Sequence, residues 1–148
     1  MVETCGFYLA TLDLRQNSDV HERVVAELLA GAGIEADYLR LSEAARVELL
    51  RAELAGRRLL SFPGATYSDE TTSERAILSR AAAALERNGA QSINNYIISK
   101  AASVSDVLEV YVLLKEAGIF RAGSPCPISV TPLFETIIAR CPAPDVDV

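Results

Sequence analysis

Cysteine and histidine are scarce in this chain. Its 148 residues include three cysteines, Cys5, Cys126 and Cys141, and one histidine. The cysteines are odd in number, lie far apart and form no Cys-x-x-Cys pair, so a structural zinc site is not expected. Free thiols in a reducing compartment are the simplest interpretation.

Basic clusters and long apolar runs are missing as well. Lys and Arg number 14 against 20 Asp and Glu, which gives a net charge of −6. An acidic chain without a basic run binds nucleic acid and anionic membranes poorly, so neither is expected as a partner. No uncharged run approaches the roughly 18–20 residues of a membrane span, and the N-terminus shows no signal-peptide pattern. We therefore expect a cytoplasmic protein that binds, at most, a small anion through a local arginine.

The sequence does contain the pattern of a β–α–β unit. Half of the residues are hydrophobic and 23% are charged, an ordinary balance for one globular domain or a piece of one. Residues 92–99 and 127–135 are rich in strand-forming residues, and residues 105–118 between them repeat apolar residues at helical spacing. This order predicts two parallel strands joined by a helix.

The residues before this unit predict one more strand and three helices. Residues 6–14, GFYLATLDL, are mostly apolar and predict a strand buried on both faces. The third helix is expected to carry Ile77 in its apolar stripe. The helix boundaries follow from capping signals: Ser18 or Asp19 to Gly33, Ser42 to Leu54, and a Thr71/Glu74 capping box to Asn88.

The order strand, three helices, strand, helix, strand predicts an α/β fold with a parallel sheet. Three strands are too few to close a barrel, which needs about eight. An open three-stranded sheet also leaves two edges unpaired, which is unfavourable in an isolated domain. The chain is therefore expected to be a fragment of a larger fold.

Two charged residues end predicted strands, where the active sites of parallel α/β folds lie. Arg15 follows the first strand, and its guanidinium can bind two oxygens of a phosphate or carboxylate. The alternative for Arg15 is a salt bridge at the rim of the sheet. Glu135 ends the third strand, and its carboxylate can hold Mg²⁺ or Mn²⁺ if further ligands are present. The alternative for Glu135 is a hydrogen bond to a neighbouring loop.

Other polar residues near these strand ends are weaker candidates. Asp13 precedes Arg15 by two residues, so both lie on the same side of the strand. Asp13 is expected to orient Arg15, and the alternative is a buried acid whose hydrogen bonds come from the backbone. Residues 16–17 are expected to form a loop. His21, in the first turn of a helix, fits a surface or packing role better than catalysis. Lys100 fits a solvated side chain better than an anion ligand.

Three blocks of the sequence resemble phosphoenolpyruvate carboxylase, in the same order and at fitting spacing. They are LATLDLRQNSDVHE (residues 9–22), YIISKAASVSDVLEVYVLLKEAG (96–118) and PLFETI (132–137). The resemblance implies that residues 1–138 form part of a helix-rich (β/α)₈ barrel of the TIM type, covering its first three strands. Residues 139–148, rich in Pro and Asp, are expected to form a loose tail.

The resemblance also implies a reaction and a set of residues that serve it. Members of this family convert phosphoenolpyruvate and bicarbonate to oxaloacetate and phosphate with Mg²⁺ or Mn²⁺, as cytoplasmic homotetramers. By the matching motifs, Arg15 of LDLRQ belongs to the residues that bind the substrate phosphate. Glu135 of PLFET is implied as a metal ligand, and Leu133 is implied to line a hydrophobic pocket beside the substrate.

The chain also departs from the family pattern. The TAHPTE histidine block, the GRGG loop and the GYSDSxKDxG block with the second metal carboxylate are missing, and the family enzyme is several times longer. Residues 139–141, Ala-Arg-Cys, replace the aspartate-leucine that usually follows PLFETI. Both ends therefore resemble a truncation or a shifted reading frame.

These departures bear on activity. One arginine and one carboxylate cannot supply the cations and the general base that the family's reaction requires. We therefore expect the isolated chain to be inactive. The alternatives are a non-enzymatic interaction module, or part of a split enzyme, that docks through its open sheet edge, and a remnant without function.

Overall fold

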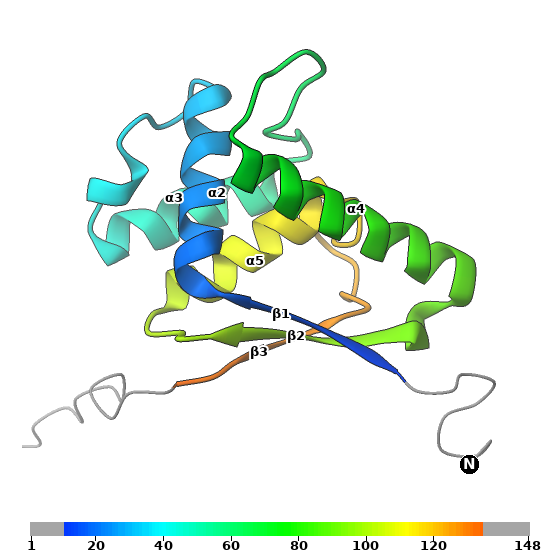
Figure 1. Cartoon of the computed structure of the whole chain (residues 1–148). Coiled ribbons are helices and arrows are strands. Elements are labelled where there is room, and N and C mark those ends of the chain that lie inside the picture. The colour runs from blue at the N-terminus through cyan, green and yellow to red at the C-terminus, as the bar shows by residue number, and fades with distance from the viewer. Residues whose placement is uncertain (1–10, 135–148) are drawn as a thin grey trace, which may run out of the picture.

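The three strands of the computed structural model, which describes residues 11–134, lie in one parallel sheet (Figure 1). The strands β1 (Leu12–Asn17), β2 (Ile93–Ser99) and β3 (Ser129–Pro132) are hydrogen-bonded in that order. The helices of this range are α2 (Ser18–Gly31), η1 (Tyr38–Arg40), α3 (Glu43–Ala55), α4 (Asp69–Asn88), η2 (Ala90–Ser92) and α5 (Val104–Glu116). The predicted helix-rich α/β class with parallel strands is confirmed. The predicted tail at residues 139–148 lies outside the described residues.

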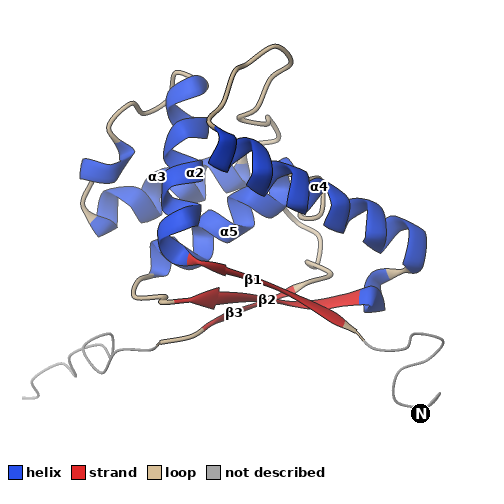
Figure 2. Ribbon diagram, in the orientation of Figure 1, coloured by secondary structure: helices blue, strands red, loops and turns tan. Residues whose placement is uncertain are grey.

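All four α-helices lie on the same face of the sheet (Figure 2). The hydrophobic core lies between this face and the helices. Its most buried members include aliphatic side chains from α2, β2 and α5, among them Val24, Leu28, Ile98 and Leu114. No helix of residues 11–134 covers the opposite face of the sheet.

The first strand differs from its prediction in position and in burial. It extends to Asn17, because residues 16–17 pair with β2 instead of forming a loop. Residues 6–10 of the predicted strand lie outside the described residues. The expected burial on both faces is wrong, since Leu12 is 67% exposed. The physical reason is that β1 is an edge strand of a sheet whose helices cover one face only.

The β–α–β unit is confirmed, with small shifts of its boundaries. In the first turn of α5, Asp106 Oδ2 accepts hydrogen bonds from the backbone N–H groups of Ala102 and Ser103, which precede the helix, at 2.7 and 2.9 Å. These bonds satisfy donors at the helix start. In the described range β3 is shorter than predicted, and Glu135 lies outside that range.

The helix-capping predictions are partly confirmed. Ser42 caps α3 as predicted, and Gly33 follows α2 with a φ of +68°, a conformation that favours glycine. The cap of α2 is Asn17, not Ser18 or Asp19. The Thr71/Glu74 capping box is wrong, because Ser68 Oγ accepts the Thr71 N–H at 3.2 Å. Ile77 is 43% exposed and does not belong to the buried stripe of α4.

No helix within residues 11–134 is long and apolar enough to cross a membrane.

Candidate functional site

The segments that follow the three strands meet at the carboxyl edge of the sheet. After β1, the Ser18 hydroxyl donates to the Lys100 carbonyl at 3.0 Å. After β3, the Leu133 N–H donates to the Ile98 carbonyl at 2.8 Å, and the Leu133 carbonyl accepts the Ala101 N–H at 3.1 Å. The three strand ends are thus tied to one another by the segment that leaves β2.

Arg15 lies on the uncovered face of the sheet, close to this edge. Its Nε–H donates to the Ser99 hydroxyl oxygen at 2.8 Å. The side chain is exposed, and no carboxylate among residues 11–134 forms an ion pair with it. The salt bridge considered as an alternative is therefore not formed within this range. Among residues 11–134, no side chain is bonded to the two Nη groups.

The expected support of Arg15 by Asp13 is not what the structure shows. Asp13 Oδ1 accepts from the side-chain amide of Asn95 at 2.9 Å, and Ser99 contacts the guanidinium instead. Asp13 and Arg15 do share a face, since they pair in register with Asn95 and Ile97. Sequence reasoning missed Ser99, because its nearness to Arg15 follows from the register between two strands 84 residues apart in sequence.

Lys100 is the one residue other than glycine with a positive φ, +59°, within residues 11–134. This left-handed conformation costs about 1–2 kcal/mol for a residue with a Cβ. Its carbonyl is held by Ser18, and its side chain is exposed, as predicted. Backbone strain often occurs at functional sites, and here it lies just after the carboxyl end of β2.

His21 is a packing residue, as predicted. It is fully buried, and its Nε2 lies 2.9 Å from the Tyr96 hydroxyl. Burial lowers the pKa of His21 to about 4, so the imidazole is neutral near pH 7. The ring lies under the helices on the covered face and cannot act as a base at the uncovered face.

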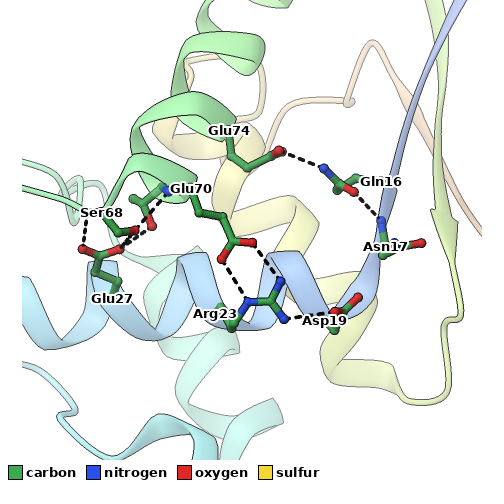
Figure 3. Close-up of polar contacts among 9 residues, drawn as sticks. Gln16, Asn17, Asp19, Arg23, Glu27, Ser68, Glu70 and Glu74 are labelled. Atoms are coloured by element: carbon green, nitrogen blue, oxygen red, sulfur yellow. Dashed lines mark hydrogen bonds and ion pairs between the residues drawn. The ribbon is translucent and has the colours of Figure 1, made fainter.

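A polar network joins α4 to α2 and to the end of β1 (Figure 3). The Gln16 amide donates to Glu74 at 2.8 Å, and Arg23 donates to both oxygens of Glu70 at 2.9 and 2.8 Å. The Arg23 hydrogen bond holds the pKa of Glu70 below its usual range, and does the same for Asp19 with a smaller contribution from the nearby Lys100 charge. Arg23 is therefore paired with two carboxylates, whereas no carboxylate of residues 11–134 pairs with Arg15.

A buried carboxyl lies away from this edge, between α5 and η1. Glu109 is fully buried, and its Oε1 accepts the Tyr38 hydroxyl at 2.8 Å. Burial raises the pKa of Glu109 to about 8, against a weaker opposing effect of the Tyr38 hydrogen bond. Its Oε2 accepts no hydrogen bond from the part of the chain that the structure describes. Because Glu109 lies in the helical layer, it does not belong to the site at the strand ends.

The implied metal ligand, Glu135, lies outside the described residues. Within residues 11–134, no cluster of three or more His, Cys, Asp or Glu side chains is placed to hold a metal ion. Leu133 is 36% exposed beside the strand ends, and its neighbour Phe134 is 56% exposed. The described part of the site thus contains an exposed arginine and an exposed apolar surface.

The sequence matches known proteins over most of its length. A family profile described as phosphoenolpyruvate carboxylase matches residues 1–146. The phosphoenolpyruvate carboxylase of Aromatoleum aromaticum is 55% identical over 146 residues, which are 98% of this chain and 16% of the relative. That of Mycobacterium leprae is 55% identical over 135 residues, covering 89% of this chain and 14% of the relative. That of Burkholderia mallei is 47% identical over 151 residues, covering 97% of this chain and 15% of the relative. The chain therefore spans about 15% of the length of these relatives.

Proposed function

This chain belongs to the phosphoenolpyruvate carboxylase family, and we propose that it supplies part of a carboxylating lyase site. The reaction joins phosphoenolpyruvate and bicarbonate to give oxaloacetate and phosphate. The observation that carries the proposal is the position of Arg15. It lies in the LDLRQ block, at the carboxyl edge of a parallel sheet, with its guanidinium exposed and unpaired by any described carboxylate.

Each proposed role follows from the chemistry of a side chain. The Arg15 fork binds two oxygens of the substrate phosphate, because the spacing of its N–H groups matches a phosphate edge. Leu133 provides an apolar wall beside the substrate. Both residues lie at the same edge of the sheet, since Leu133 is bonded to the backbone at Ile98, one residue before Ser99.

The proposal includes Mg²⁺ or Mn²⁺ with Glu135 as one ligand. A carboxylate is a suitable donor for these cations, but one carboxylate does not form a site. When bound, such an ion supplies positive charge to substrate oxygens. Within residues 11–134, no cluster of three or more His, Cys, Asp or Glu side chains is placed to supply the other ligands.

The wider setting of the chain is proposed from its family alone. We place it in the cytoplasm, with phosphoenolpyruvate and bicarbonate as partners and with neither nucleic acid nor membrane as one. A homotetramer is the assembly that the family resemblance implies.

Arg15→Ala is expected to weaken phosphoenolpyruvate binding by about tenfold or more, because charge-assisted hydrogen bonds to the phosphate are lost. The affinity of Arg15→Lys should fall between those of the unaltered chain and Arg15→Ala, since lysine keeps the charge and loses the guanidinium fork. The measurement is a titration of the purified chain with phosphoenolpyruvate, followed by NMR. Arg51→Ala, an exposed arginine on α3, is the matched control and should bind like the unaltered chain. Equal losses in the two alanine variants would show non-specific attraction and contradict the proposal.

A second candidate function is docking onto another protein part through the sheet. Both β1 and β3 are edge strands, and the face opposite the helices is uncovered within the described range (Figure 2). Leu12 and Phe134, near the ends of these strands, are 67% and 56% exposed. Exposed edges and apolar side chains of this kind favour association.

The purified chain alone is expected to give no oxaloacetate from phosphoenolpyruvate and bicarbonate. His21 is buried and neutral, so the described residues offer no histidine base at the uncovered face. Coupling the product to malate dehydrogenase and following NADH oxidation measures the rate. Turnover above background would disprove the inactivity.

Mixing the chain with the remaining part of the Aromatoleum aromaticum relative tests docking by size-exclusion chromatography, and two separate unchanged peaks would count against docking.

A further inference from the structure

Arg15 contacts Ser99 through Nε, the innermost nitrogen of its guanidinium. Arg15 pairs in register with Ile97, and Ser99 is the next residue of β2 on the same face. The guanidinium therefore leans along the sheet toward its carboxyl edge. There the Nε–H donates to Ser99 Oγ at 2.8 Å, which fixes the plane of the group from its inner side.

Ser99 is itself held rigidly. It is 5% exposed, while Arg15 above it is exposed. The next residue, Lys100, is locked at a φ of +59°, and its carbonyl accepts the Ser18 hydroxyl. On the other side, Ile98 accepts the Leu133 N–H at 2.8 Å. Because the backbone on either side of Ser99 is held by neighbouring strand ends, its buried hydroxyl is a good anchor for a long, flexible side chain.

We propose that Ser99 is a positioning residue for the substrate phosphate. This inference rests on the proposed role of Arg15 as a phosphate ligand. By occupying Nε, Ser99 turns the two Nη groups outward, so that the phosphate is bound end-on by both of them. Ser99 also reduces the number of arginine rotamers that must be frozen when the anion binds, and each such side chain costs affinity when it is immobilised on binding.

The first test reads the contact directly in the 148-residue chain. The Nε–H signal of Arg15, assigned by its disappearance in Arg15→Lys, should exchange slowly with water. In Ser99→Ala the exchange should become several-fold faster, whereas Ser99→Thr, which keeps a hydroxyl, should retain the slow exchange. Ser129→Ala, which removes an exposed hydroxyl from β3, is the matched control and should leave the signal unchanged. Unchanged exchange in Ser99→Ala would overturn the proposal.

The second test measures phosphoenolpyruvate affinity by NMR titration of the same variants. Ser99→Ala should bind roughly three- to tenfold more weakly, and Ser99→Thr should restore most of the affinity. If Arg15→Ala weakens binding and Ser99→Ala does not, the phosphate site stands and the positioning role is wrong. If the unaltered chain binds no phosphoenolpyruvate, the proposed function is wrong and the substrate role of Ser99 fails with it. Thermal unfolding of each variant is the control, and an unchanged unfolding temperature separates a loss of affinity from a loss of structure.

Discussion

Replacing Leu28 with alanine is expected to lower the free energy of unfolding by about 3–5 kcal/mol. Leu28 is fully buried on α2, within the core between the helices and the sheet. Its loss removes apolar contacts and leaves a cavity that the rigid neighbours fill only in part. For a domain of typical stability, about 5–15 kcal/mol, this is a large fraction of the total. Urea unfolding followed by circular dichroism measures the effect.

Leu39→Ala serves as the control for this substitution. Leu39 is 51% exposed in η1, so the same change of side chain should cost less than about 1 kcal/mol. Equal losses for the two variants would contradict the packing of α2 against the sheet.

Stability is expected to fall by about 2 kcal/mol as the pH rises from about 6.5 to about 8.5. The cause is Glu109, whose pKa rises from 4.5 in the unfolded chain to about 8 when the residue is buried. Between these values the folded state binds one proton more than the unfolded state, so rising pH favours unfolding. The contribution is complete below pH 4.5 and is lost as the pH passes through about 8.

His21 titrates near the lower end of this window and acts in the opposite direction. His21 has a pKa lowered by burial from 6.5 to about 4, so it destabilises the fold only as the pH falls below 6.5. Asp106, Glu22 and Arg46 are the charged groups that act on Glu109, after burial and the Tyr38 hydrogen bond. Glu109→Gln should flatten the fall in stability, since the amide still accepts a hydrogen bond but does not ionise. Glu48→Gln, on the exposed part of α3, is the control and should show the same fall in stability as the unaltered chain. An unchanged slope in Glu109→Gln would disprove this assignment.

Local signals were sufficient to predict much of the helical layer. Ser42 and Gly33 mark helix ends through short-range hydrogen bonding and backbone freedom, which depend on few neighbours. The β–α–β unit was predictable because a change from strand-forming residues to helical spacing is visible within one segment. The cap of α4 was not. Ser68 and Thr71 are both residue types that suit a helix start, and Ser68 is the one that caps α4. Both hydroxyls also donate to Glu27 of α2, a contact between segments far apart in sequence.

The candidate site was predictable in its residue types but not in its contacts. Arg15 was found because it follows an apolar run and lies in a family block. Asp13 was assigned to orient it, because residues two apart share a face of a strand. The partner is Ser99, and this choice depends on the register between β1 and β2, to which sequence spacing gives no access.

The sequence by itself determined the family, the α/β class and the placement of Arg15 near the end of a strand, because these depend on local pattern and on motif identity. Only the tertiary structure decided which side chains meet. It placed Ser99 beneath the Arg15 guanidinium and left one sheet face uncovered by the helices within residues 11–134. It also buried His21 and Glu109, and so shifted the pKa of each toward its neutral form. The physical reason is that register, burial and desolvation arise from segments far apart in sequence, and take their values only when the chain is packed.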